Sequence, residues 1–178
     1  LQAPGIVGGS KRKAQAVAAG LGKIDAAFGQ YALARIAMAD EDAATVRRHV
    51  LAAYAARPGE DTFRMAAGLM HQEAKEWDQA FAVFEAWTRD EPQSASAWYQ
   101  LGRTSALSGQ RPAEGVAAFE RVLALYPQPG APEHKHAWYR MGQIHALAGD
   151  TAAARRAFEQ ALKLDPGLKE AREALEAL

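Results

Sequence analysis

Cysteine and asparagine are both absent from the 178-residue sequence. Without cysteine the chain can form neither disulfide bonds nor thiolate metal sites, and this absence fits a reducing or an oxidising compartment equally well. Lysine and arginine number 21, as do aspartate and glutamate, so the formal net charge is zero. That balance argues against a nucleic-acid-binding protein, which usually carries a basic surface.

Long apolar runs are missing too, since no stretch approaches the ~20 residues that a helix needs to cross a bilayer. The sequence also lacks a phosphate-binding glycine loop, a nucleophile elbow and a His-Glu-x-x-His zinc motif. The charged run 40–42 is typical of a turn between helices, and the scattered histidines form no catalytic set. The sequence therefore predicts a protein that is not an enzyme and needs no cofactor.

A repeated pattern organises the chain. Two stretches place a tryptophan, an apolar residue followed by glycine, a phenylalanine and a proline at matching intervals: Trp98, Leu101, Gly102, Phe119 and Pro127, then Trp138, Met141, Gly142, Phe158 and Pro166. Prolines keep the period, because Pro58 and Pro92 are 34 residues apart, as are Pro132 and Pro166.

This pattern resembles the tetratricopeptide repeat family, whose unit is a 34-residue helix-turn-helix. The resemblance implies an all-α fold, a right-handed superhelical α-solenoid of stacked hairpins, in a single domain over residues 1–178. Each unit buries its core only against its neighbours. We expect four repeats, over 27–58, 61–92, 95–127 and 133–166, with helices over 61–73, 77–90, 95–108, 112–125, 134–148 and 151–164, and a hairpin over 27–56.

The ends and one insertion depart from the regular pattern. Residues 1–25 predict a loop up to Gly9, an N-cap at Ser10 and one helix that corresponds to the second half of a repeat. Residues 168–178 alternate apolar and charged positions at helical spacing and predict a terminal capping helix. The extra residues between Pro127 and Pro132 predict an exposed, extended loop, because proline lacks an N–H donor and fixes φ.

Small residues recur where the two helices of a hairpin should meet. Gly142 lies midway along a first helix and Ala154 opposite it on the second, with Phe158 beside them. Glycine costs a helix ~1 kcal/mol, which close packing would offset. Trp87 occupies a place that holds Ala161 in the last repeat, and this departure predicts either a splayed helix pair or a ring that covers an unusual gap.

Members of the family bind extended or helical peptides on a concave face, to which each first helix contributes its second, fifth, sixth and ninth positions. Carried over to this chain, the expected peptide-binding residues are Tyr31, Arg35, Met65, Leu69, Tyr99, Gln100, Arg103, His136, Tyr139, Arg140 and Gln143. Tyrosine and arginine are over-represented at binding hot spots, which favours a recognition surface. The alternative is that the tyrosines pack between successive first helices.

The expected function is a non-enzymatic scaffold that binds a peptide or protein segment of combined apolar and acidic character, since tyrosine covers apolar groups and arginine pairs with carboxylates. A second hypothesis is a self-associating structural module, because a half repeat at the N-terminus leaves an apolar face uncovered. The chaperone-binding branch of the family clamps two carboxylates with lysine and asparagine. The absence of asparagine argues against that type of ligand.

Two short motifs and the N-terminal residues each allow more than one interpretation. Glu133, His134 and His136 suggest a zinc site, but three or four converging ligands are required, so the stretch more simply begins a helix. The basic triplet 11–13 either steers an acidic partner or is a solvated face. The opening residues 3–14 resemble those of exported bacterial tetratricopeptide proteins, which implies a periplasmic location, with the cytoplasm as the alternative. The first residue, Leu1, is compatible with removal of a signal peptide.

Overall fold

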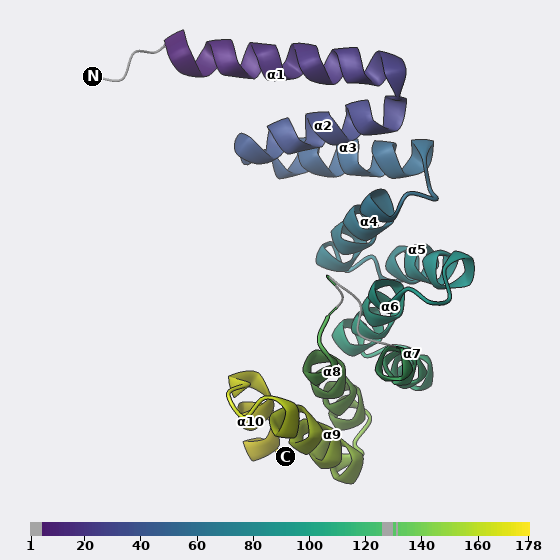
Figure 1. The fold of residues 1–178 in the computed structure, drawn as a ribbon. Helices are drawn as coiled ribbons and strands as arrows, with labels where there is room; N and C mark the ends of the chain where they lie inside the picture. The colour runs from purple at the N-terminus through teal and green to yellow at the C-terminus, as the bar shows by residue number, and fades with distance from the viewer. Residues whose placement is uncertain (1–4, 126–129, 131) are drawn as a thin grey trace. The chain divides into compact units, whose positions relative to one another are not determined.

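The computed structural model describes residues 5–125, 130 and 132–178, and within them the chain is helical, without strands (Figure 1). This confirms the predicted all-α fold class. The chain forms two compact units, one up to Met70 and one from His71. The helices are α1 (Gly5–Ile24), α2 (Ala26–Ala39), α3 (Ala43–Ala56), α4 (Asp61–Glu73), α5 (Trp77–Asp90), α6 (Ala95–Ser108), α7 (Pro112–Ala124), α8 (His134–Leu147), α9 (Thr151–Leu164) and α10 (Lys169–Glu176).

The predicted helix bounds in the repeats agree closely with the observed ones. Helices α4, α5, α6 and α9 coincide with the predicted ranges, and α7 and α8 end one residue early. Short polar side chains begin several of these helices by accepting backbone N–H groups that the first turn leaves free. Asp42 accepts from Thr45 at 3.0 Å, Asp150 from Ala153 at 2.9 Å.

The predicted N-terminal loop is wrong from Gly5 onward, because α1 begins at Gly5 rather than after Ser10. Ser10 lies inside the helix with an exposed side chain and caps nothing. The glycines at 8 and 9 each cost about 1 kcal/mol of helix propensity, which is too little to stop a helix that continues for 20 residues. The loop predicted over 128–131 lies outside the described residues, apart from Gly130.

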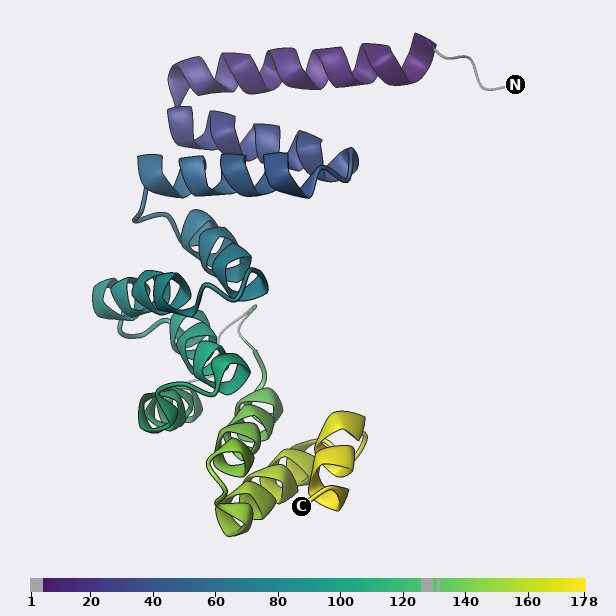
Figure 2. The same cartoon turned by 180° about the vertical axis from the view of Figure 1, so that it is seen from behind.

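In the unit up to Met70, α1, α2 and α3 lie side by side, as Figures 1 and 2 show from opposite directions. Helices α1 and α2 approach closely at Gly22 and Gly29, since a Cβ added to Gly29 would lie 2.4 Å from the Gly22 Cα. Asp25 separates the two helices and accepts from Ala27 and Phe28, so it both ends one helix and begins the next. This unit's core includes Phe63, which is fully buried.

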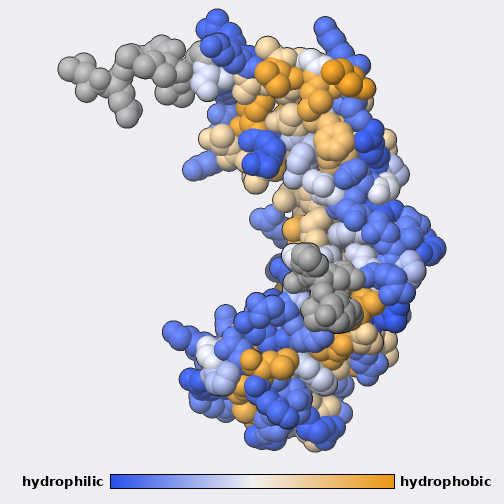
Figure 3. All heavy atoms as spheres, viewed as in Figure 1, coloured by the Kyte–Doolittle hydropathy of each residue, from blue (hydrophilic) through white to orange (hydrophobic). Residues whose placement is uncertain are grey.

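Exposed apolar side chains remain on the same unit. Val17 and Ile24 on α1 are 70% and 86% exposed, and Met38 on α2 is also exposed. Figure 3 shows apolar residues gathered over α1–α3 on the face that it presents. An α1 surface of this kind is what the uncovered half repeat predicts.

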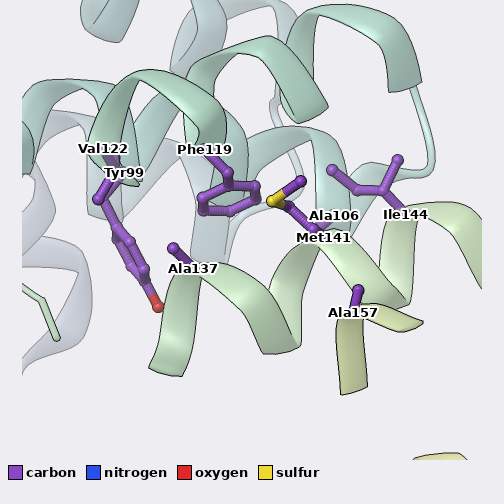
Figure 4. Close-up of a cluster of buried hydrophobic side chains, with 8 residues drawn as sticks. All are labelled: Tyr99, Ala106, Phe119, Val122, Ala137, Met141, Ile144 and Ala157. Atoms are coloured by element: carbon purple, nitrogen blue, oxygen red, sulfur yellow. The ribbon is translucent and has the colours of Figure 1, made fainter. Parts of the chain in front are cut away.

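In the unit from His71, glycine and phenylalanine pack as the repeat pattern predicts. A Cβ on Gly142 would lie 2.4 Å from Phe158 Cε1, and one on Gly102 would lie 2.8 Å from Phe119 Cε2. Phe119 belongs to a buried cluster that joins α6, α7, α8 and α9 (Figure 4). The missing side chains therefore make room for the rings that form the core.

Trp87 on α5 lies in the core, although the last repeat holds alanine at this place. The ring is only 3% exposed and stacks on Phe84, with ring centroids 6.5 Å apart. Its indole N–H is buried and has no hydrogen-bond partner among the described residues. The large ring is thus buried although its indole N–H makes no hydrogen bond to the described residues.

Across the described residues, none of the helices combines the length and apolar character that crossing a membrane requires. Nor do those residues contain a group of three or more His, Asp or Glu side chains arranged to hold a metal ion. Glu133 begins α8 as its N-cap residue but makes no side-chain capping bond, because its carboxylate pairs with Lys135 at 3.0 Å.

Candidate functional site

The predicted peptide-binding residues lie on the first helix of each hairpin. Those in the unit up to Met70 lie on α2 and α4, and those in the other unit lie on α6 and α8. Within the second unit, α6 and α8 pack against each other. Positions on these two helices are therefore close enough to form one surface.

Tyr31 on α2 has a largely structural role. Its half-buried ring contacts Phe63 of α4, with the ring centroids 5.4 Å apart. Arg35 is exposed and lines a cleft of about 560 Å³ between α1 and α2, together with Ile36 and Ala14. Met65 and Leu69 on α4 are half-buried. Tyr31 thus follows the alternative in which a tyrosine packs between first helices.

Tyr99 on α6 is more deeply buried than the other predicted tyrosines. It is 8% exposed and its ring meets Phe119 edge-on, with centroids 5.6 Å apart (Figure 4). Little of this ring is left for contact with a ligand. Its main role in this unit is to join α6 to the core cluster.

Arg103 lies one turn after Tyr99 and is held by a residue that the sequence reasoning missed. Its Nη1 donates to the side-chain oxygen of Gln72 on α4. Gln72 is 4% exposed and donates in turn to the Thr104 hydroxyl at 2.8 Å and to the Gln100 carbonyl at 3.3 Å. The sequence offered one indication that Gln72 has a special role, because the equivalent position in the two later repeats holds alanine.

Arg140 on α8 belongs to a second small network. Its Nη1 donates to Gln143 Oε1 at 2.8 Å, and Gln143 Nε2 donates to the Tyr139 hydroxyl at 2.9 Å. The guanidinium also lies 5.4 Å from the centroid of the Tyr139 ring, within cation–π range. Three of the predicted residues are thus brought into direct contact with one another.

The charge of Arg103 is destabilised where it lies. Burial lowers the pKa of the Arg103 guanidinium, and the positive charge of Arg140 lowers it further, while Tyr99 acts in the opposite direction. Arginine still remains protonated at neutral pH, because its ordinary pKa exceeds 12. Among the described residues no carboxylate comes within ion-pair distance of Arg103 or Arg140.

His136 lies at the other end of this surface, in the first turn of α8. It is half-buried. Nearby, the hydrogen bond from Lys135 is the main cause that lowers the pKa of the Asp165 carboxyl, and the backbone N–H of Gly167 lowers it further. Lys135 and Asp165 are 3.1 Å apart. This end of the surface therefore carries paired charges, in contrast to Arg103 and Arg140.

The fold and this surface define a helical repeat protein with polar and aromatic side chains on neighbouring first helices. A family model described as tetratricopeptide repeat matches residues 71–127 and 104–169, which together span more than half of the chain. The chain belongs to the tetratricopeptide repeat family. No curated protein sequence matches it.

Solved structures of similar fold support this assignment. YrrB, described as a TPR protein with an unusual peptide-binding site, has a TM-score of 0.77 at 17% identity, covering 94% of this chain and 84% of YrrB. PilW, a type IV pilus biogenesis factor, has a TM-score of 0.67 at 22% identity, covering 83% and 66% respectively. PilF of Pseudomonas aeruginosa has a TM-score of 0.54 at 18% identity, covering 96% and 91%. Identities this low show the fold alone.

The predicted solenoid class is thus confirmed. Tetratricopeptide proteins are generally scaffolds for protein–protein interaction, and the fold of this chain implies that general role.

Proposed function

We propose that the chain is a non-enzymatic scaffold that binds a peptide or protein segment on the concave face formed by its first helices. The observation that carries this proposal is the group Gln100, Arg103, Tyr139, Arg140 and Gln143, which gathers polar and aromatic side chains on two adjacent first helices. Aromatic and arginine side chains supply most of the binding energy at many interfaces. The partner in this proposal combines apolar and acidic groups.

The residues of this surface have different roles in the proposed binding. Tyr139 offers an aromatic ring for apolar contact, and Gln143 fixes its hydroxyl. Arg103 and Arg140 supply positive charge, and Gln100 and His136 lie on the same two helices, α6 and α8. Tyr31, Arg35, Met65 and Leu69 are proposed as the corresponding residues of the other unit. Tyr99, which is mostly buried, supports the surface from behind.

A partner captured from the native organism tests the proposal when it is titrated against variants. Arg103→Ala is expected to weaken binding by ~1–3 kcal/mol, as loss of a charged hydrogen bond usually does, and to leave the melting temperature close to that of the parent. Arg155→Ala, an exposed arginine on the second helix α9, is the matched control and should bind like the parent. Loss of binding in the control together with normal binding in Arg103→Ala would contradict the proposal.

A second candidate function is self-association through α1. The observation that favours it is the exposure of Val17 and Ile24, seven residues apart on one helix face. In this case Val17→Lys with Ile24→Glu should convert an oligomer to a monomer in sedimentation experiments. A parent chain that sediments as a monomer at all concentrations tested would remove this alternative.

A periplasmic, exported location also stays a proposal. It rests on the likeness of residues 3–14 to exported members of the family. Fractionation of the native cells with an antibody to the protein would test it, and recovery only with the cytoplasmic fraction would contradict it.

A further inference from the structure

Two guanidinium groups on neighbouring helices bond to neutral acceptors within the described part of the chain. Arg103 donates to the amide oxygen of Gln72, and Arg140 donates to that of Gln143. A guanidinium carries five N–H donors, so most donors of both side chains have no partner among the described residues. Both arginines are half-buried, which makes their hydration less complete than on an open surface.

Two other cations of the same unit are paired with carboxylates. Arg111 contacts Glu85 at 2.6 Å, and Lys135 contacts both Glu133 and Asp165. The chain has as many acidic as basic side chains, yet among the described residues none of the acidic ones pairs with Arg103 or Arg140. Two like charges held near each other without a counterion raise the free energy of the unoccupied site.

A polar atom next to the arginines is also unsatisfied. The side-chain oxygen of Gln100, one turn before Arg103, is buried and has no hydrogen-bond partner among the described residues. Buried acceptors without a partner are uncommon in folded proteins and require an explanation. An extended segment carries backbone N–H donors of the kind that this oxygen lacks.

We infer that Arg103 and Arg140 form one subsite for the side-chain carboxylate of an aspartate or glutamate within the bound segment. The inference rests on the proposed function and adds the chemistry of the residue recognised. A carboxylate accepts from guanidinium N–H groups in short, charge-assisted bonds and offsets the repulsion between the two arginines. Gln72 and Gln143 are the positioning residues, because each holds one guanidinium without neutralising it.

An internal side chain suits this site better than a chain terminus. Arg103 contacts Gln72 and Arg140 contacts Tyr139, so a polar or aromatic side chain adjoins each of the two arginines. A segment that runs through can contact Tyr139 with one residue and the arginines with the next. A terminal carboxylate would use only one side of this surface.

Three peptides of nearly equal shape separate these possibilities. The first is acetyl-Leu-Glu-Leu-amide, the second has Gln in place of Glu, and the third is the Gln peptide with a free carboxyl terminus. Titration of the full chain, followed by NMR of the arginine side-chain N–H signals, should show binding of the Glu peptide with shifts at both arginines. The Gln peptide should bind about tenfold or more weakly, because it lacks the charged acceptor.

Variants assign the effect to the subsite. Arg103→Gln and Arg140→Gln should each reduce the preference for the Glu peptide about tenfold, whereas Arg155→Gln, exposed on α9, should keep it. Gln72→Glu places a carboxylate beside Arg103 from within the protein. It should weaken binding of the Glu peptide while leaving the Gln peptide unchanged, an effect that simple misfolding does not give.

Each other outcome overturns the inference. Equal affinity for the Glu and Gln peptides, or no shift at either arginine with any peptide at its highest soluble concentration, would exclude a carboxylate subsite. Tighter binding of the free-terminus peptide would replace the internal side chain by a chain terminus. The proposed function fails separately, since its test uses the native partner: it is contradicted when Arg103→Ala binds that partner like the parent while Arg155→Ala does not.

Discussion

Single residues decide how closely the helices of this chain approach. Gly142 leaves space that the ring of Phe158 occupies, and Gly102 does the same for Phe119. Both pairs were predicted from their spacing, because a repeat that places a glycine on one helix and a phenylalanine on the next implies contact. In each pair the helix gives up ~1 kcal/mol of propensity and the core gains a fully buried ring.

Larger side chains at these positions should disturb the core. Gly142→Leu and Ala154→Leu are each expected to lower the free energy of unfolding by ~1–3 kcal/mol through overpacking. Urea denaturation followed by circular dichroism measures the change. Ala152→Leu, two residues away and exposed on the same helix, should have little effect. Parent-like stability in both buried variants would show that the assigned register is wrong.

Charge pairing at the start of α8 predicts a pH effect. The hydrogen bond from Lys135 holds the pKa of Asp165 below its ordinary range, so the ion pair stabilises the fold at neutral pH and this contribution is lost as pH falls through the lowered pKa. Lys135→Gln should therefore be less stable than the parent at pH 7, and the difference should shrink in strong acid. A constant difference down to the lowest pH measured would contradict this, with Lys169→Gln as the exposed control.

At the scale of helices, the turn inside each hairpin uses one backbone conformation. Each of these turns contains a residue of positive φ: Glu41 and Lys75 at 57°, Gly109 at 70° and Gly149 at 78°. Glycine adopts this left-handed region at no steric cost, whereas other residues lose roughly 1–2 kcal/mol there. The turns at Glu41 and Lys75 therefore carry strain that a glycine avoids at Gly149. The turn at Gly109 also contains a non-glycine residue of positive φ, Arg111 at 50°.

Replacing the strained residues by glycine should stabilise the chain. Glu41→Gly and Lys75→Gly are each expected to raise the free energy of unfolding by ~0.5–1 kcal/mol, the steric relief less the entropy that glycine gains in the unfolded chain. Gly149→Lys is the reverse control and should destabilise. The denaturant concentration at the midpoint of unfolding measures the change in each variant. A loss of stability in both glycine variants would show that the Glu41 and Lys75 side chains contribute more free energy than the positive φ costs.

Helix bounds were largely predictable because the period, the prolines and the capping residues all indicate the same places. The start of α1 was not, since the cost of two glycines is small beside the length of that helix. The candidate surface was predictable only as a set of positions. Gln72 was missed because its bond to Arg103 joins residues 31 apart in sequence, and such pairing depends on rotamers that no period encodes.

At the scale of the whole molecule, the unit from His71 contains its own core. The clusters around Phe119 and around Leu168 both lie within it, and the family model matches residues 71–169 of the chain. Helix α4 spans the boundary between the units, so a fragment that keeps the helix whole must begin at Asp61.

A fragment of residues 61–178 is expected to fold on its own. It should unfold in one cooperative transition and bind acetyl-Leu-Glu-Leu-amide with an affinity close to that of the full chain, since Gln72, Arg103 and Arg140 are all included. Circular dichroism and the same NMR titration provide the measurements. A fragment that melts without a cooperative transition would show that the unit needs the preceding helices.

The buried indole of Trp87 also gives this chain an optical label. Its N–H has no partner among the described residues, whereas the indole N–H of Trp98 donates to the Pro92 carbonyl at 3.0 Å beside solvent. An indole in an apolar, dry environment emits at shorter wavelengths and is poorly quenched by iodide. The short-wavelength edge of the tryptophan emission should therefore come from Trp87 and disappear in Trp87→Phe. The emission wavelength of the parent chain then shows whether α5 remains packed.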